Sequence, residues 1–305
     1  MSGVAVVTDS TSSLAPSLAE ETGITVVPLQ VVIDGRSRPE SFRPGPGVVT
    51  PGAVAAALRE GRSVSTSRPS PEAFTSAYEA AIRAGATAIV SVHLSSEISG
   101  TCDAASSAGA ALTRATGVPV IVVDSETVGP GCGYAALTAA SQARSGGSVE
   151  AVAEAARRRA LGSTTWFCVE NLEYLRRGGR IGTAQALLGS ALAVKPLLTM
   201  VDGRISPSER VRTVSRALAR LAELAGTALS QASGGTGASG GTGAPGGHGS
   251  DVTVLHLDNR SAADRLARSL SGSGPGVSVA VSDVSAVLGV HCGPGTIGVV
   301  VSPRG

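Results

Sequence analysis

Runs of Val and Ile separated by Ala-rich stretches occupy the first half of the chain and constrain its fold more than any other feature. Residues 4–7, 88–92 and 118–123 are apolar at nearly every position, and a further apolar run covers residues 24–33. Strands of this kind are buried on both faces, as in parallel sheets covered by helices. The sequence therefore predicts an α/β/α parallel-sheet domain over residues 1–162, with helices at residues 16–22, 51–60, 71–84, 100–116, 131–145 and 148–161.

The pattern changes after residue 162. Residues 197–205 are typical of a hairpin around Asp202-Gly203, a dipeptide that suits a tight turn. We expect a second, smaller mixed-sheet α/β domain over residues 163–305. Its predicted strands are 164–170, 197–201, 204–205, 252–257, 277–281 and 297–301, and its predicted helices are 184–193, 211–225 and 262–270. Glycine is the commonest residue at 230–250, which predicts a flexible insertion inside this domain.

Charge, aromatic content and cysteine spacing argue against several classes of protein. The net charge is +2, and aromatic residues make up 2% of the chain, so we expect no nucleic-acid partner. The four cysteines are too far apart to form a metal-ligand pair and are expected to be reduced thiols, and no metal is expected. The chain starts without a leader pattern and has no apolar run that spans a bilayer. These features predict a soluble, cytoplasmic protein without stable membrane insertion.

Three Ser/Thr-rich segments, at residues 8–11, 65–70 and 95–101, each lead into a predicted helix. The loops at the carboxyl ends of parallel strands meet at one crevice, and the free N–H groups at helix starts favour an anion. Each segment could instead serve only as a helix N-cap. Taken together, the three segments favour a binding site for a carboxylate or a phosphate.

Two further motifs add candidate ligand-binding groups. Three arginines surround a Gly-Gly pair at residues 176–180, which favours an anion-facing loop, although a solvated basic turn is the alternative. His291 lies in a glycine-dense turn before the last strand and is a candidate to hydrogen-bond a ligand, with a satisfied turn histidine as the alternative. His93 and His256 lie in or beside strands, and we expect them to be structural.

Seven motifs follow one another along nearly the whole chain. They are Thr8-Asp9-Ser10-Thr11, Thr66-Ser67-x-Pro69-Ser70, Ser95-Ser96-x-x-Ser99-Gly100-Thr101, Leu175-x-x-Gly178-Gly179-Arg180-Ile181, Lys195-Pro196, Val211-Arg212-Thr213 and His291-x-Gly293-Pro294-Gly295. Together and in this order they resemble the DegV family. The resemblance implies a two-domain protein that holds one long-chain fatty acid, such as hexadecanoate, between its domains. It also implies the lipid-binding subunit of a fatty acid kinase, which phosphorylates the carboxylate to an acyl-phosphate for phospholipid synthesis.

By position, the resemblance assigns the fatty-acid carboxylate to Thr66 and to the serine loop, with Ser99 as first choice and Ser96 as second. His291 completes this group. A buried carboxylate needs hydrogen-bond donors, because without them it takes up a proton. We expect the hydroxyls and the imidazole to supply these donors without a fixed positive charge at the carboxylate.

Arg180 and Arg212 resemble the family's arginines that serve the kinase encounter and the phosphoryl transfer, and we expect them at the rim of the site. The resemblance implies no catalytic residue in this chain and no cofactor besides the bound fatty acid. The chain departs from the family at two positions. Arg68 stands where glutamine is usual and adds a charge near the serine loop, and Cys102 stands where an aromatic residue is common.

Two alternatives belong to other functional classes. The first is a hydrolase that uses Ser96 or Ser99 with His291, although the chain lacks the Gly-x-Ser-x-Gly motif of α/β hydrolases. The second is a regulator that binds a nucleotide or a sugar phosphate, for which a glycine-rich phosphate loop is missing.

Overall fold

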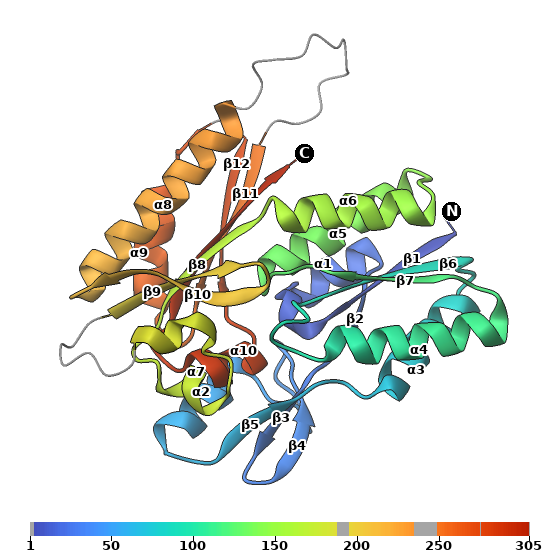
Figure 1. Ribbon diagram of the computed structural model, residues 1–305, viewed down its shortest axis with the longest axis horizontal. Coiled ribbons are helices and arrows are strands. Elements are labelled where there is room, and N and C mark those ends of the chain that lie inside the picture. Colours follow the sequence, from blue (N-terminus) through green and yellow to red (C-terminus); the bar gives the residue numbers. More distant parts are fainter. Residues whose placement is uncertain (1–2, 188–194, 235–248, 275, 305) are drawn as a thin grey trace.

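The computed structural model describes residues 3–187, 195–234, 249–274 and 276–304, which form three sheets (Figure 1). Strands β2-β1-β6-β7 form one sheet, β10-β9-β8-β13-β11-β12 the second, and β4-β3-β5 the third. The strands are β1 (Val4–Asp9), β2 (Thr25–Val27), β3 (Gln30–Ile33), β4 (Arg36–Pro39), β5 (Val64–Ser67), β6 (Ala88–His93), β7 (Val120–Asp124), β8 (Thr164–Cys168), β9 (Lys195–Val201), β10 (Arg204–Val211), β11 (Gly249–His256), β12 (Val277–Asp283) and β13 (Ile297–Arg304).

The helices lie mainly between and around these sheets. Their order along the chain reproduces the predicted alternation with strands, and the α/β fold class is confirmed. The α-helices are α1 (Pro16–Thr22), α2 (Pro51–Arg59), α3 (Pro71–Arg83), α4 (Thr101–Thr116), α5 (Pro130–Arg144), α6 (Val149–Leu161), α7 (Glu173–Arg177), α8 (Val214–Gly234), α9 (Arg260–Leu270) and α10 (Ala286–Cys292), and two short 3-10 helices are η1 (Ser10–Ser12) and η2 (Gly182–Leu187).

The four-stranded sheet is parallel throughout and has helices on both faces, as the apolar runs predict. Helices α5 and α6 pack on one face through small and branched side chains such as Ala139 and Val152. Helices α3 and α4 cover the other face, where Phe74 and Tyr78 are fully buried. The side chains on α5 are small, so this helix packs closely against the four-stranded sheet. Helix α5 also contacts β13 of the six-stranded sheet.

The six-stranded sheet is antiparallel except where β11 pairs with β12. Helices α8 and α9 bury its outer face, and its inner face is turned towards the rest of the molecule (Figure 1). The predicted hairpin is confirmed: Asp202 and Gly203 both have positive φ and join β9 to β10. Edge strand β10 contains Pro207, next to which the pairing register shifts.

The three-stranded antiparallel sheet is the main difference from the prediction. The single strand expected at residues 24–33 is two strands, β2 and β3, which belong to different sheets. Pro28 lies between them and has no N–H group for a ladder bond, so the chain leaves the first sheet there. The polar segment expected as a loop at residues 65–70 begins as strand β5, which pairs with β3. Helices α2 and α10 cover this small sheet.

Three other expectations have different outcomes. The helix predicted at residues 184–193 is a 3-10 helix that ends at Leu187, and residues 188–194 lie outside the described part of the chain. Helix α8 runs to Gly234 and β11 starts at Gly249, so both ends of the predicted insertion, 230–250, belong to regular elements. Residues 235–248 lie outside the described part of the chain. The domain boundary at 162/163 stays a prediction. In the described residues, no helix is both long enough and apolar enough to cross a bilayer.

Candidate functional site

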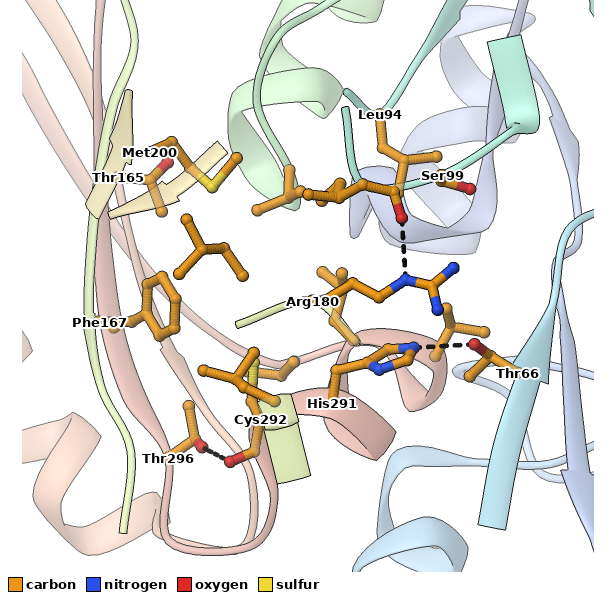
Figure 2. A pocket seen from close by; sticks show the side chains of 18 of the residues that line it. Thr66, Leu94, Ser99, Thr165, Phe167, Arg180, Met200, His291, Cys292 and Thr296 are labelled. Carbon is orange, nitrogen blue, oxygen red and sulfur yellow. Dashed lines mark hydrogen bonds between the residues drawn. The ribbon is translucent and has the colours of Figure 1, made fainter. Parts of the chain in front are cut away.

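A cavity of about 320 Å³ lies where the inner face of the six-stranded sheet, the loop after β6, the small sheet and α10 come together (Figure 2). Most of its wall is apolar, which suits a hydrocarbon chain. The chain's single tryptophan, Trp166, is part of this wall. The apolar lining residues are Leu29, Leu94, Ile98, Val128, Trp166, Phe167, Leu175, Met200, Ile205, Leu255, Val284, Val287 and Leu288.

Polar side chains gather at one end of the cavity, and they include three of the four predicted carboxylate ligands. Thr66 comes from β5, Ser99 from the loop after β6, and His291 from the last turn of α10. Thr66 Oγ1 lies 2.8 Å from His291 Nε2, although the two residues are 225 positions apart in sequence. Ser99 Oγ lies 2.8 Å from Thr101 Oγ1. Three distant segments of the chain thus place hydroxyl and imidazole groups on one cavity wall.

His291 lies in a helix, which corrects the predicted glycine-dense turn. The sequence Ala286–Cys292 forms α10, capped by the Ser285 hydroxyl, which accepts the Leu288 N–H. Burial, together with the smaller effect of the neighbouring Arg180, lowers the pKa of His291 to about 4. The imidazole is therefore neutral near pH 7. Its Nδ1 is buried and has no hydrogen-bond partner in the described structure.

Two exposed arginines, Arg68 and Arg180, also line the polar end of the cavity. Arg180 Nε donates to the Ile98 carbonyl at 3.1 Å, and its Nη1 donates to the Gly178 carbonyl at 2.6 Å. Figure 2 shows its guanidinium beside His291 and Ser99. Arg68 Nη1 donates to the Gly100 carbonyl at 3.3 Å, so this residue brings a charge to the serine loop as expected. Hydroxyls, a neutral imidazole and two guanidinium groups together suit an anionic head group.

Ser96 and Arg212 lie away from this cavity. The hydroxyl and the N–H of Ser96 both donate to the Asp124 carboxylate on the exposed surface. Arg212 lines a separate hollow of about 490 Å³ between β10 and α8, together with Arg210, Arg216 and Arg220. Sequence position alone could not separate Ser96 from Ser99, because the two serines are three residues apart in one irregular loop.

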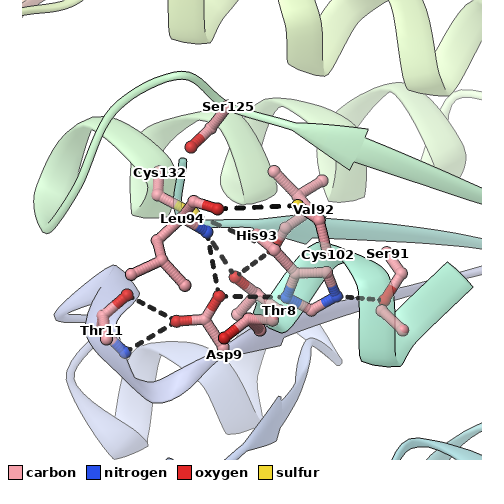
Figure 3. A network of polar contacts seen from close by, with 12 residues as sticks. Thr8, Asp9, Thr11, Ser91, Val92, His93, Leu94, Cys102, Ser125 and Cys132 are labelled. Carbon is pink, nitrogen blue, oxygen red and sulfur yellow. Dashed lines mark hydrogen bonds and ion pairs between the residues drawn. The ribbon is translucent and has the colours of Figure 1, made fainter. Parts of the chain in front are cut away.

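The Thr8–Thr11 segment, predicted to face the same crevice, forms a buried network instead (Figure 3). The Asp9 carboxylate accepts the Thr11 N–H at 3.0 Å and the Leu94 N–H at 3.0 Å. Its Oδ2 also lies 3.0 Å from His93 Nδ1, and His93 Nε2 lies 2.7 Å from Ser91 Oγ. His93 has no exposed surface, so its structural assignment agrees with this position. The network fixes the loop that leads to Ser99.

Several cavity residues give little signal in the sequence. Trp166, Phe167 and Met200 look like ordinary sheet residues, because alternating strand positions say which face is buried but not that the face borders a hollow. Gly178 is a second case: its Cα packs against His291, which the flexibility of glycine alone does not reveal.

Comparison with known proteins places this arrangement in a family. The model of an uncharacterised protein family, DegV, matches residues 3–304. The chain belongs to the DegV family. A DegV domain-containing protein of Streptomyces coelicolor is 46% identical over 302 residues, which cover 99% of each chain. Another, of Deinococcus radiodurans, is 35% identical over 98% of each chain.

Solved DegV structures have the same fold. A DegV family protein from Thermus thermophilus, described by its fatty acid binding, has a TM-score of 0.84 and 32% identity, and the match covers 99% of this chain and 100% of that one. DegV from Bacillus subtilis, described as a fatty acid binding protein, has a TM-score of 0.83 and 28% identity, and the match covers both chains completely. The three-sheet α/β fold of this DegV chain is therefore that of its family.

Proposed function

We propose that this DegV chain binds one long-chain fatty acid, such as hexadecanoate, with the tail in the apolar cavity and the carboxylate at its polar end. The observation that carries this proposal is the contact between Thr66 Oγ1 and His291 Nε2 at the end of an otherwise apolar hollow. The fatty acid binding described for the Thermus and Bacillus relatives supports it.

The physical balance favours such a ligand. Burial of a methylene contributes about 0.8 kcal/mol, so the fourteen methylenes of hexadecanoate contribute on the order of 11 kcal/mol before ordering costs. The carboxylate loses water when it enters the site and needs hydrogen bonds in return. Thr66, Ser99 and His291 supply them, while Arg68 and Arg180 attract the negative charge. A tail without the acid, or an acid without the tail, uses only half of the cavity.

The hydrolase alternative requires a serine activated by His291. His291 Nε2 contacts a threonine, Ser99 Oγ contacts Thr101, and Ser96 contacts Asp124. No described contact joins either serine to the imidazole. The binding function is therefore the better supported of the two.

The proposal is tested by binding of hexadecanoate, followed through the fluorescence of Trp166 in the cavity wall. Thr66→Val removes one hydroxyl and keeps the shape of the side chain. Loss of a hydrogen bond to a charged group costs about 1.5–3 kcal/mol, so we expect roughly 10- to 100-fold weaker binding. His291→Ala should weaken binding similarly.

Thr75→Val is the matched control, because its hydroxyl donates to the Pro71 carbonyl at the start of α3 and does not line the cavity. It should leave the affinity unchanged. Native mass spectrometry of the purified protein adds a second readout, in which a co-purifying mass equal to a fatty acid is expected. Failure of hexadecanoate to bind, or equal binding by Thr66→Val and the parent chain, would rule out the proposed site.

We further propose that the chain presents the bound carboxylate to a fatty acid kinase, for conversion to an acyl-phosphate. Arg180 lies at the polar end of the cavity, where it could balance charge on a transferring phosphoryl group. Arg212 is exposed and lines the hollow next to α8 together with three other arginines and two glutamates, and there it could contact the kinase. The lipid pocket and the kinase contact are thus assigned to different residues.

Arg212→Ala separates these two roles. Because Arg212 does not line the cavity, the variant should bind hexadecanoate as the parent chain does. With ATP and a fatty acid kinase, its acyl-phosphate formation should fall by roughly tenfold or more. Arg114→Ala, an exposed arginine on α4, is the control and should support the full rate. Loss of lipid binding in Arg212→Ala, or an unchanged rate, contradicts this assignment.

A further inference from the structure

A buried carboxyl group lies outside the cavity, between the small sheet and α10. Glu40 is 5% exposed, and both of its carboxyl oxygens are hydrogen-bonded. Ser10 Oγ donates to Oε1 at 2.5 Å, and the Val287 N–H donates to Oε2 at 2.7 Å. No cation contributes to its surroundings among the described residues. Ionising a carboxyl group that is buried without a neighbouring cation costs free energy. Glu40 does not line the cavity and is therefore separate from its polar end.

Glu40 and Ser10 hold the backbone of two residues that line the cavity. The Leu29 N–H donates to Ser10 Oγ at 2.8 Å, and the Glu40 N–H donates to the Leu29 carbonyl at 2.9 Å. The side chain of Glu40 holds Val287 in the first turn of α10. Leu29 and Val287 both line the cavity. One side chain therefore joins two parts of the cavity wall.

The same two elements carry the Thr66–His291 pair. Leu29 leads into β3, which pairs with β5 and thereby with Thr66. Val287 lies four residues before His291, one turn away on the same face of α10. The distance between Thr66 and His291 consequently depends on how α10 sits against the small sheet, and Glu40 is a direct side-chain link between the two.

Burial favours the neutral form of Glu40. Burial raises its pKa to about 7, and Asp9 acts in the same direction, whereas hydrogen bonds from Ser10, Val287 and Ser285 oppose the shift. At the far end of α10, the pKa of His291 lies at about 4, so His291 does not titrate in this range. The other charged groups on the elements around Glu40 are exposed: Glu20, Arg36, Arg38, Arg43, Arg59 and Asp258.

We propose that Glu40 is the positioning residue for α10 and His291. Its hydrogen bond from the Val287 N–H holds α10 against the small sheet, and this closed position is favoured while Glu40 is protonated and disfavoured when it ionises, because the buried carboxylate lacks hydration. When α10 moves away, Glu40 reaches water and regains the ordinary affinity of a glutamate for protons. Glu40 binds its proton more tightly when α10 is packed against it (closed) than when α10 has moved away (open). The proton therefore stabilises the closed state fully at pH values below the ordinary glutamate pKa of 4.5. This advantage is lost as pH rises through the closed-state value.

Hydrogen exchange of the α10 amides in the ligand-free protein tests this directly. With pKa values of 4.5 when open and about 7 when closed, the opening constant of α10 should rise about tenfold between about pH 6 and about pH 8. Protection factors, which correct for the intrinsic effect of pH on exchange, should fall by the same factor. In Glu40→Gln the amide oxygen can accept the Val287 N–H and the amide group can donate to Ser10, so protection should not change with pH.

Release of hexadecanoate gives a second readout, which rests on the proposed function. Because α10 supplies Val287, Leu288 and His291 to the cavity wall, its opening uncovers the ligand. The dissociation rate, measured by Trp166 fluorescence, should rise about tenfold over this pH range in the parent chain and stay flat in Glu40→Gln. If hexadecanoate does not bind while protection of α10 still follows Glu40, the proposed function fails and the inference stands.

Two further variants complete the test. Glu79→Gln makes the same chemical change on the exposed face of α3 and should behave as the parent chain does. Ser10→Ala keeps Glu40 but removes a hydrogen bond that lowers its pKa, so the midpoint of the pH effect should move upward. This variant also serves if Glu40→Gln does not fold. The inference is overturned if the parent chain and Glu40→Gln show the same pH dependence, or if Ser10→Ala leaves the midpoint unchanged.

Discussion

Gly178 leaves the space that the His291 ring occupies. A Cβ at this position would overlap His291 Nδ1, whereas the backbone φ of Gly178 is −73° and suits any residue. The first glycine of the Gly-Gly pair is therefore required by contact with the imidazole, not by its backbone conformation. Its carbonyl also accepts a hydrogen bond from Arg180, so one residue holds both the arginine and the histidine in place.

Gly178→Ala should consequently displace His291 from Thr66. We expect hexadecanoate affinity to fall by about tenfold and stability to fall by about 1–3 kcal/mol, as in overpacked cores. Gly52→Ala is the matched control, because this glycine lies in helix α2 with open space around its Cα. It should keep the affinity and gain roughly 0.5–1 kcal/mol. Equal affinities of the two variants in a Trp166 fluorescence titration would show that Gly178 does not position His291.

At the same scale, the sequence identifies some side chains of the candidate site and misses others. The motif resemblance points to Thr66 and His291, which the structure brings into contact. It cannot indicate that Arg180 reaches the polar end of the cavity, since that depends on the Ile98 carbonyl in a distant loop. Nothing in the sequence indicates that Glu40 is buried, because a glutamate in a polar stretch is normally exposed.

At the scale of elements, the parallel strands are the most predictable part of the fold. Their burial on both faces produces unbroken Val and Ile runs, and the structure confirms them as β1, β6 and β7. Strand β5 was missed because its residues are polar and partly exposed, so no apolar period exists to detect. Helix α10 was not predicted, because Gly289, Gly293 and Gly295 together are typical of a turn. Gly289 packs against Leu257 instead, where a larger residue would crowd the leucine.

The first sheet and the six-stranded sheet are joined by polar contacts as well as by helices α5 and α6. Ser95 Oγ donates to the Gly203 carbonyl at 2.7 Å, which links the serine loop to the β9–β10 turn. Tyr134 on α5 lies 2.6 Å from Thr253 Oγ1 on β11. None of these four residues lines the cavity. Sequence patterns predict each sheet separately, and the hollow between them follows only from how the sheets are packed.

A ligand in this cavity contacts walls from several parts of the molecule at once, so binding should stabilise the whole chain. Hexadecanoate at about 100 times its Kd should raise the free energy of unfolding by about 2.7 kcal/mol, if the unfolded chain does not bind it. Leu94 comes from the first half of the chain and Phe167 from the second, so unfolding of either half exposes the tail. Ligand should therefore move a single transition upward.

The measurement is thermal unfolding followed by Trp166 fluorescence and by far-ultraviolet circular dichroism, with and without ligand. Trp166 reports on the six-stranded sheet, whereas circular dichroism reports on all helices and strands. Octanoate is the control, because it keeps the carboxylate and lacks eight methylenes, each of which contributes about 0.8 kcal/mol on burial. At equal concentration it should shift the transition far less. A ligand that moves the fluorescence transition but leaves the circular dichroism transition in place would mean that the cavity stabilises one sheet alone, because a tail held between both halves must couple them.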